Sequence, residues 1–433
     1  MRIWLASLIT LTIASAVRAD DWPGWMGPQR DNVWREKNII DAFPKGGPKV
    51  LWRTKVANGY SGPAVAGGLV FLTDFVPDQD VQKDNFDREK FKGKERVLCL
   101  DAKTGDVKWK HETACVYNVS YPNGPRCTPN VDGGKVYTLG AVGNLYCFDA
   151  QTGKVEWSRD FQKDYSVPVP LWGFAAHPLI DGDRLICLVG GEGSVAVAFD
   201  KNTGKEIWKN LTAGEPGYSP PMIVTAAGKR QLLVWHPESL NGLDPETGKS
   251  FWSVKQETVN GTSIMAPRML DNHIFLGAWQ RKGGMFKFDA GAISVKMVWK
   301  GNRDNSIYPV NNTPFLEAGH IYGVCSDGEL RCVDMKTGDR VWETYAPVTG
   351  KNAGSGTAHL VKHDDRFFIA SETGDLIIAK LTPKKYEEVS RWHMLDATSK
   401  AFGREVTWSH PAFAQQFVFA RNDRELICVS LAK

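Results

Sequence analysis

Three histidines occupy the same position in different copies of a repeated segment, and imidazoles arranged in a ring could bind a metal ion. They are His177, His359 and His410. Other copies hold a small residue at this position: Gly62, Thr128, Ala266 or Thr313. Neutral imidazole is a common ligand of zinc and related metals. The histidines belong to the third, seventh and eighth copies, which places them on roughly opposite sides of a ring. We therefore expect structural histidines, satisfied by backbone groups or water, and no metal site.

A second group of residues could recognise an anion or a sugar at a channel mouth. Arginine beside aromatic side chains around a concave opening suits such ligands. With the three histidines, the candidate ligand-binding residues are Arg126, Trp172, Arg268, Tyr308, Arg404 and Trp408. The alternative interpretation is a solvated polar rim without a ligand.

No constellation in the sequence predicts catalysis. Ser409 and His410 are neighbours on a predicted strand, so their side chains point to opposite faces and cannot form a catalytic pair. Residues 190–193, Gly-Gly-Glu-Gly, lie in a predicted hairpin turn. No helix follows that would make this turn a phosphate-binding loop. We assign no catalytic residue.

A repeated hairpin must position these side chains, and residues 330–342, "LRCVDMKTGDRVW", are one copy of it. The apolar alternation predicts a strand, and "MKTG" predicts a tight turn. In that turn Asp334 accepts hydrogen bonds from the following amides, and Gly338 supplies a positive φ. The return strand ends in Trp342, whose ring we expect to be buried between neighbouring copies.

Each copy holds a second pair of strands before the hairpin, which makes four strands per repeat and eight repeats. Four-stranded units of about 40–50 residues are typical of β-propellers. "LICVSL" near the C-terminus is a first strand without a return, and "KVLW" near the N-terminus is a return strand without a first. The sequence predicts an all-β, eight-bladed propeller closed by pairing of these two segments, because closure removes open edges. An open solenoid is the alternative. Residues between blades should gather on one face, around the central channel.

The N-terminal residues predict export. Residues 1–19 have a basic start, a short apolar core and a small-x-small ending at Ala19, as a signal peptide does. Its core is short for a membrane span, and no cysteine follows it that could carry a lipid anchor. Residues 20–49 form an arm with Trp22, Trp25 and Trp34, expected to pack on the propeller of residues 50–433. We expect a charged insertion, residues 76–95, to project into solvent.

Net charge and cysteine positions limit the kinds of binding site that the sequence predicts. A formal net charge of +4 is too small to indicate a nucleic-acid surface. Four of the 8 cysteines occupy equivalent strand positions and predict core packing. These four are Cys99, Cys147, Cys332 and Cys428. Cys115 and Cys127 share a loop and could form a disulfide in an oxidising compartment. No spacing indicates zinc.

The hairpins resemble the pyrroloquinoline quinone (PQQ)-like repeat. "LDAKTGDVKW", "FDAQTGKVEW", "LDPETGKSFW" and "VDMKTGDRVW" carry the resemblance. The repeat builds eight-bladed propellers of quinoprotein dehydrogenases and of outer-membrane assembly factors, and "DWPGWMGPQRDNVW" is similar to exported members from planctomycete-type bacteria. Quinoprotein dehydrogenases hold PQQ between two adjacent cysteines and a tryptophan, beside a Ca²⁺ bound by Glu, Asn and Asp. The resemblance implies that a dehydrogenase of this family would carry these residues. This sequence has no adjacent cysteines, and we match no such ligand set.

Together these observations predict an exported, non-catalytic binding or scaffold protein that meets a protein or glycan partner at the loop face. We predict no cofactor. The alternatives are a divergent quinoprotein or sugar-active oxidoreductase, using PQQ and calcium, and a carbohydrate-binding propeller. A fold of this kind does not by itself decide between them.

Overall fold

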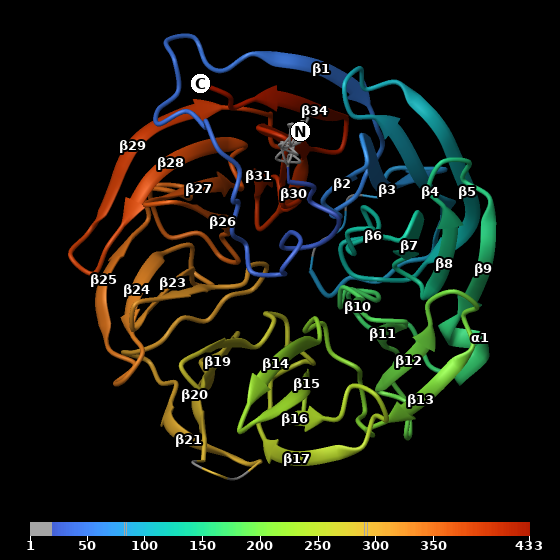
Figure 1. Cartoon of the computed structure of the whole chain (residues 1–433). Helices are drawn as coiled ribbons and strands as arrows, with labels where there is room; N and C mark the ends of the chain where they lie inside the picture. The colour runs from blue at the N-terminus through green and yellow to red at the C-terminus, as the bar shows by residue number, and fades with distance from the viewer. Residues whose placement is uncertain (1–19, 82, 84, 290, 292) are drawn as a thin grey trace, which may run out of the picture.

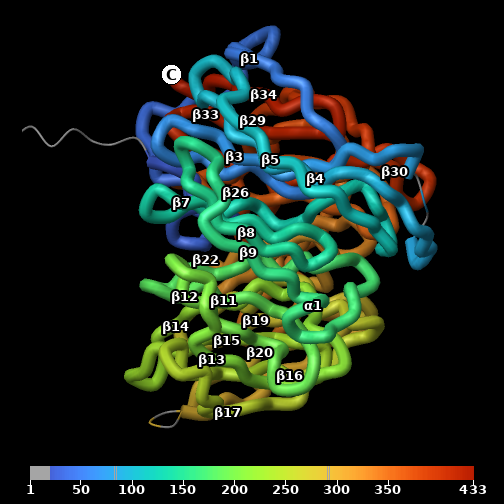
Figure 2. Tube along the Cα trace, turned by 90° about the vertical axis from the view of Figure 1, so that its right-hand side faces the viewer, coloured from blue at the N-terminus to red at the C-terminus, as the bar shows by residue number. Residues whose placement is uncertain are grey.

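The computed structural model describes residues 20–433, except 82, 84, 290 and 292, and within them eight four-stranded antiparallel sheets stand in a ring (Figure 1). The predicted eight-bladed propeller is confirmed. The predicted signal peptide, residues 1–19, lies outside the described residues. Seen from the side, the ring is a thick disc (Figure 2).

The blades are numbered along the chain, and each runs from the channel outward. Blade 1 consists of β2 (Ala64–Ala66), β3 (Leu69–Pro77), β4 (Phe91–Asp101) and β5 (Val107–Tyr117), and blade 2 of β6 (Asn130–Asp132), β7 (Lys135–Leu139), β8 (Asn144–Asp149) and β9 (Val155–Asp160). Blade 3 consists of β10 (Leu179–Asp181), β11 (Arg184–Leu188), β12 (Ala196–Asp200) and β13 (Glu206–Asn210), and blade 4 of β14 (Met222–Ala226), β15 (Lys229–His236), β16 (Ser239–Leu243) and β17 (Ser250–Lys255).

Blades 5 to 8 consist of β18 (Arg268–Leu270), β19 (His273–Ala278), β20 (Lys282–Phe288) and β21 (Val295–Lys300); β22 (Phe315–Glu317), β23 (His320–Val324), β24 (Leu330–Asp334) and β25 (Arg340–Thr344); β26 (Ala358–His363), β27 (Arg366–Ser371), β28 (Asp375–Leu381) and β29 (Tyr386–His393); and β32 (Ala412–Ala414), β33 (Phe417–Arg421), β34 (Glu425–Ser430) and β1 (Val50–Lys55). A short helix, α1 (Phe161–Tyr165), follows blade 2, and a hairpin of β30 (Ser399–Ala401) and β31 (Arg404–Val406) precedes blade 8. No helix among the described residues is long and apolar enough to cross a membrane.

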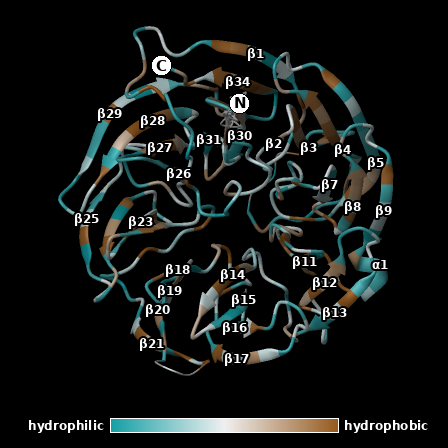
Figure 3. Cartoon of the chain, viewed as in Figure 1, coloured by the Kyte–Doolittle hydropathy of each residue, from teal (hydrophilic) through white to brown (hydrophobic). Residues whose placement is uncertain are grey.

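The two ends of the chain close the ring, as the split repeat predicts. In blade 8, β1 pairs antiparallel with β34, with Val50 opposite Val429 and Trp52 opposite Cys428. Apolar residues are concentrated in the strands (Figure 3), and they form clusters that join neighbouring blades. One such cluster contains Phe315 of blade 6 and Phe367 of blade 7.

The repeated turn has the predicted geometry. Asp334 Oδ1 accepts hydrogen bonds from the amides of Lys336 (2.7 Å) and Thr337 (3.0 Å), and Gly338 has a φ of +82°. Gly338 also lies against Trp299 of the preceding blade, where an added Cβ would approach the indole to 2.9 Å. The glycine is therefore required twice, for the turn and for contact between blades. The same contact occurs in the pairs Trp52–Gly105, Trp109–Gly153, Trp157–Gly204 and Trp208–Gly248.

The contribution of these tryptophans should differ between blades. Trp208 is 7% exposed, and its Nε1 donates to the Pro245 carbonyl (3.2 Å). Trp342 is only partly buried, contrary to the sequence prediction, because the turn it meets at Thr382 lacks the Thr-Gly pair. We expect Trp208→Ala to lower the free energy of unfolding by about 3–5 kcal/mol and Trp342→Ala by clearly less. Urea unfolding measures both; equal losses would show that the glycine contact contributes nothing.

Cys115 and Cys127 do not pair. Each of the eight cysteines lies among the described residues, and each is a free thiol. Cys115 packs against the cluster that contains Phe75 and Tyr117, whereas the Cys127 thiol lies 3.8 Å from the Phe174 carbonyl in a different cluster. The four cysteines predicted to pack in strands are fully buried.

Candidate functional site

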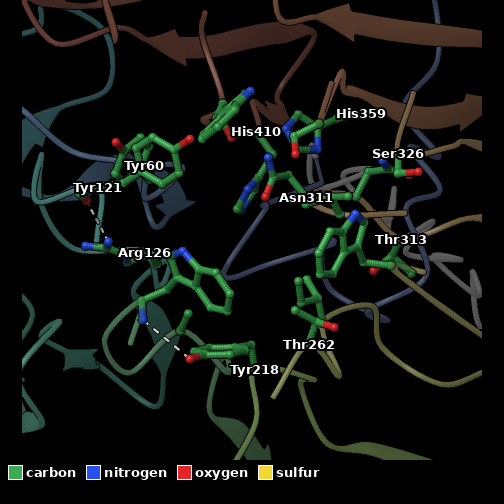
Figure 4. A pocket seen from close by; sticks show the side chains of 18 of the residues that line it. Tyr60, Tyr121, Arg126, Tyr218, Thr262, Asn311, Thr313, Ser326, His359 and His410 are labelled. Atoms are coloured by element: carbon green, nitrogen blue, oxygen red, sulfur yellow. Dashed lines mark hydrogen bonds between the residues drawn. The ribbon is translucent and has the colours of Figure 1, made fainter. Parts of the chain in front are cut away.

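A cavity of about 370 Å³ opens at the channel mouth, on the face formed by the segments between blades. The loops predicted to gather there do so: Tyr121, Thr262 and Asn311 come from three different inter-blade segments and surround one space (Figure 4). Cavities of this size are at the small end of ligand pockets in proteins.

The N-terminal arm closes the other end of the cavity. Trp25, Met26 and Asn32 are lining residues, and the Trp25 ring stacks on His177 with ring centroids 4.7 Å apart. The arm crosses the face opposite the β30–β31 hairpin (Figure 2). Partly buried Arg30 fixes it there by donating to the Pro178 carbonyl (3.0 Å). The channel is therefore a blind pocket with one opening.

The three histidines converge at the axis, so the prediction that they lie on opposite sides is wrong. The ring centroids of His177 and His410 are 5.4 Å apart, and those of His359 and His410 are 5.5 Å apart. His410 can reach across because the equivalent residue of blade 1 is Gly62, where a Cβ would lie 2.9 Å from His410 Nε2. That nitrogen contacts the Thr128 hydroxyl of blade 2 at 2.7 Å.

Proximity does not make this cluster a metal site. Among the described residues, no group of three or more His, Cys, Asp or Glu side chains is arranged to hold a metal ion. The imidazoles have partners in the protein instead. The Thr128 amide donates to His177 Nδ1 (3.1 Å), and His359 Nε2 donates to the Trp408 carbonyl (3.2 Å).

Burial keeps these imidazoles neutral. Loss of hydration lowers the pKa of His359 to about 4 and that of His410 to about 3. The pKa of His177 is lowered well below its ordinary value, by burial first and then by His410 and the charge of Arg30. At neutral pH the centre of the pocket therefore carries no charge from histidine.

The charged insertion contributes to the pocket, contrary to the expectation that it projects into solvent. Its ends lengthen β3 and β4, and its turn folds back so that Asn85 and Phe86 line the cavity. Trp172 Nε1 donates to Asn85 Oδ1 (2.9 Å). The Phe86 and Trp172 rings are 5.7 Å apart, and Trp172 contacts Tyr218 at 5.5 Å. These aromatic rings form one wall of the mouth.

A second aromatic wall is built around Trp408. Its ring centroid lies 6.1 Å from that of Tyr60 and 5.4 Å from that of Tyr121. Trp408 Nε1 donates to the buried carboxylate of Glu372 (3.2 Å), which Arg404 also binds, through Nε, at 2.8 Å. The sequence predicted Arg404 to line the pocket. Instead, Arg404 acts through Glu372 on the position of Trp408.

Several residues that line the pocket have strained backbone. Several lining residues other than glycine have φ values between 50° and 71°, in the left-handed region: Met26, Asn32, Phe86, Tyr121, Ser355 and Phe402. This conformation costs about 1–3 kcal/mol for a residue with a side chain, and it is found preferentially at functional sites. The strain therefore occurs both in the floor formed by the arm and at the mouth.

Charge is nearly absent from the pocket. Among the described lining residues, the charged side chains are Arg126 and Asp327, and Asp327 is exposed at the rim. The Arg126 guanidinium donates to the carbonyls of Gly124, Ser120 (3.0 Å) and Tyr121 (2.7 Å). These hydrogen bonds hold a loop in place, and the positive charge of Arg126 remains at the pocket.

Two other predicted site residues lie away from the pocket. Arg268 is partly buried and donates to the Arg30 carbonyl of the arm (3.1 Å), so it fixes the floor from behind. The Tyr308 hydroxyl donates to the Asn302 carbonyl (2.6 Å) within its own loop. The structure does bring together six of the sequence candidates as lining residues: Arg126, Trp172, His177, His359, Trp408 and His410.

Sequence reasoning missed other lining residues. Trp25 carried a signal, because a tryptophan in a Pro/Gly-rich arm must be buried somewhere. Asn311 and Asn312 lie in a segment recognised as a loop of the binding face, but nothing in a single sequence separates them from other loop amides. The missed lining residues with polar or aromatic side chains include Trp25, Asn32, Tyr60, Asn85, Phe86, Trp279, Asn311 and Asn312.

Comparison with known proteins agrees with the repeat. The family model described as "Outer membrane protein assembly factor BamB" matches residues 93–344 and 241–433, more than half of the chain. The chain belongs to this PQQ-like β-propeller family. BamB of Yersinia pestis is 20% identical to this PQQ-like propeller over 201 residues, 44% of this chain and 49% of that relative. The chain thus spans about half the length of the curated relative it matches.

Solved structures share the fold at low identity. BamB from Moraxella catarrhalis superposes on this PQQ-like propeller with a TM-score of 0.53 and 15% identity, covering 88% of this chain and 98% of the other. A quinohemoprotein alcohol dehydrogenase, ADHIIG from Pseudomonas putida HK5, gives a TM-score of 0.58 and 15% identity, covering 95% and 80%. At such identities the likeness shows the fold and not the activity.

The pocket does not fit the quinone of the dehydrogenase branch. PQQ carries three carboxylates, which would need basic partners, and among the described lining residues Arg126 is the one cationic side chain. The sequence has no adjacent cysteines. The cluster at the axis consists of neutral histidines rather than the carboxylate and amide oxygens that Ca²⁺ prefers.

Proposed function

We propose that this PQQ-like propeller is an exported, non-catalytic binding protein that takes a small ligand, or the end of a protein or glycan partner, into the blind mouth of its channel. The observation that carries the proposal is the pocket itself. In the described part of the chain it has a floor built by the arm, two aromatic walls and strained backbone at several lining residues.

Chemistry of the lining supports binding over catalysis. A general acid or base works best when its pKa lies near the operating pH. Desolvation lowers the pKa of His359 to about 4 and that of His410 to about 3, so neither is protonated at neutral pH. Their hydrogen-bond partners are a backbone carbonyl and the Thr128 hydroxyl, and an imidazole with so low a pKa is a poor base toward that hydroxyl. The export half of the proposal is supported by the pattern of residues 1–19.

The proposal is tested with a broad fragment library and ligand-detected NMR. Ala175 lines the cavity, and Ala175→Trp should fill it, so we expect bound fragments to be lost in this variant. Trp342→Phe, on an outer strand far from the mouth, is the matched control and should keep them. Binding that survives Ala175→Trp, or no binding by any fragment at millimolar concentration, would contradict a pocket function.

A further inference from the structure

The pocket contains polar atoms that no protein group satisfies. Asn311 and Asn312 both line it, and Asn311 Nδ2 and Asn312 Oδ1 are buried without a hydrogen-bond partner among the described residues. Asn312 is 5% exposed, and its orientation is fixed because its Nδ2 donates to the Val324 carbonyl (3.1 Å) and the Thr357 hydroxyl (3.1 Å). A donor and an acceptor from adjacent residues thus remain available to a ligand. Leaving such atoms unpaired is costly, so their presence points to a partner.

The histidines add a second donor and acceptor set. His177 Nδ1 accepts from an amide, which in the neutral ring assigns the proton to Nε2, a donor. His359 Nε2 donates to a carbonyl, which leaves Nδ1 as an acceptor. Both rings are lining residues. The asparagines and histidines together therefore offer both donors and acceptors without a charge. Such a set suits hydroxyl groups, because a hydroxyl both donates and accepts.

The aromatic walls define the rest of the ligand. Trp172 and Trp408 belong to separate aromatic groups on the lining, and Phe86 and Phe402 at the rim are about half exposed, at 49% and 48%. Aromatic surface of this kind packs against flat apolar faces. A ligand that suits this pocket must present apolar C–H faces together with many uncharged hydroxyl groups.

We propose that the ligand is an uncharged saccharide of one or two sugar rings, held between the aromatic walls by Asn311, Asn312 and the neutral histidines. This deepens the proposed function and rests on it. An anionic sugar or quinone is disfavoured because Arg126 is the single cationic side chain on the described lining and its guanidinium already donates to backbone carbonyls, and Asp327 at the rim repels anions. The cavity of about 370 Å³ limits the size.

The test measures binding of two matched sugar panels to the full mature chain, by intrinsic tryptophan fluorescence and by calorimetry. The neutral panel contains glucose, galactose, mannose, xylose, N-acetylglucosamine, maltose and cellobiose. The charged panel contains glucuronate and galacturonate, with PQQ plus Ca²⁺ alongside. We expect at least one neutral sugar to bind and its charged counterpart to bind about tenfold more weakly or not at all.

Variants place the sugar in the pocket. Asn311→Ala should weaken binding about tenfold by removing one donor, and Trp172→Ala by a similar factor or more through loss of ring contact. Tyr308→Phe, in the same inter-blade segment as Asn311 but not itself a lining residue, is the control and should leave affinity unchanged. Thermal melts of each variant without sugar separate loss of affinity from loss of folding.

The outcomes separate the two proposals. If uronates or PQQ bind and neutral sugars do not, the saccharide inference is overturned and the pocket function stands. The same holds if library fragments bind in the pocket and no sugar of either panel does. If a neutral sugar binds equally well to Asn311→Ala and Trp172→Ala, its site lies elsewhere and the inference fails. If neither sugars nor fragments bind, both proposals fail together.

Discussion

A chain that ends at Glu425 should lose cooperative folding. Removal of residues 426–433 deletes nearly all of β34, which pairs with β1 on one side and β33 on the other. Leu426, Ile427 and Val429 are fully buried, and burial of each such side chain stabilises the fold by about 2 kcal/mol. That total approaches the whole stability of a typical domain, about 5–15 kcal/mol. The measurement is a thermal melt followed by circular dichroism.

The control for this truncation is a chain that lacks only Lys433, which lies after the last strand. It should melt like the full chain. If the chain ending at Glu425 also melted at the temperature of the full chain, closure through β34 would be irrelevant to stability.

Acid should destabilise the protein well before its carboxylates titrate. A histidine whose pKa is lowered on folding binds fewer protons in the folded state than in the unfolded state, so stability falls as pH drops from about 6.5 toward the folded pKa. Burial lowers the pKa of His359 to about 4 and that of His410 to about 3, and lowers that of His177 well below its ordinary value. Each of these three histidines should lower the free energy of unfolding by on the order of 1 kcal/mol between pH 6 and pH 5, or about 3 kcal/mol together.

Urea unfolding at pH 7, 6 and 5 measures this slope. His410→Gln should flatten it by about one proton, since glutamine does not titrate. His393→Gln is the control: the pKa of His393 is raised, first by its hydrogen bond to Asp375, so both states are mostly protonated below pH 6 and the slope between pH 6 and pH 5 should change little. A slope unaffected by His410→Gln would show that this imidazole is not neutral in the folded protein.

The fold was predictable because its information is repeated. Each "Asp-x-x-Thr-Gly" turn encodes a hairpin locally, and the unpaired strands at the two ends encode closure. The contact of the turn glycine with the tryptophan of the preceding blade was not foreseen, because it joins residues about 40 positions apart that a hairpin interpretation treats separately.

The site was less predictable because it depends on side-chain reach and on irregular segments. Counting blades placed His177 and His410 far apart, but Gly62 leaves room for His410 to lean across blade 1. The insertion before β4 was expected in solvent because its composition is charged, yet Asn85 and Phe86 within it turn back to the mouth. Composition describes a segment on average, whereas a site depends on single residues.

The arm has a mechanical consequence beyond closing the pocket. Blades in a ring contact mainly their neighbours, so the ring alone resists local deformation better than flattening into an ellipse. Between residues 20 and 34, backbone and side chains bond to blades on several sides: Val65, Val131, Pro178, Arg268, Lys362 and Gln415. By joining blades on several sides of the ring, the arm therefore stabilises its circular shape. A ligand that contacts Trp25 would therefore contact the segment that joins these blades, and its effect would reach blades that do not contact each other directly.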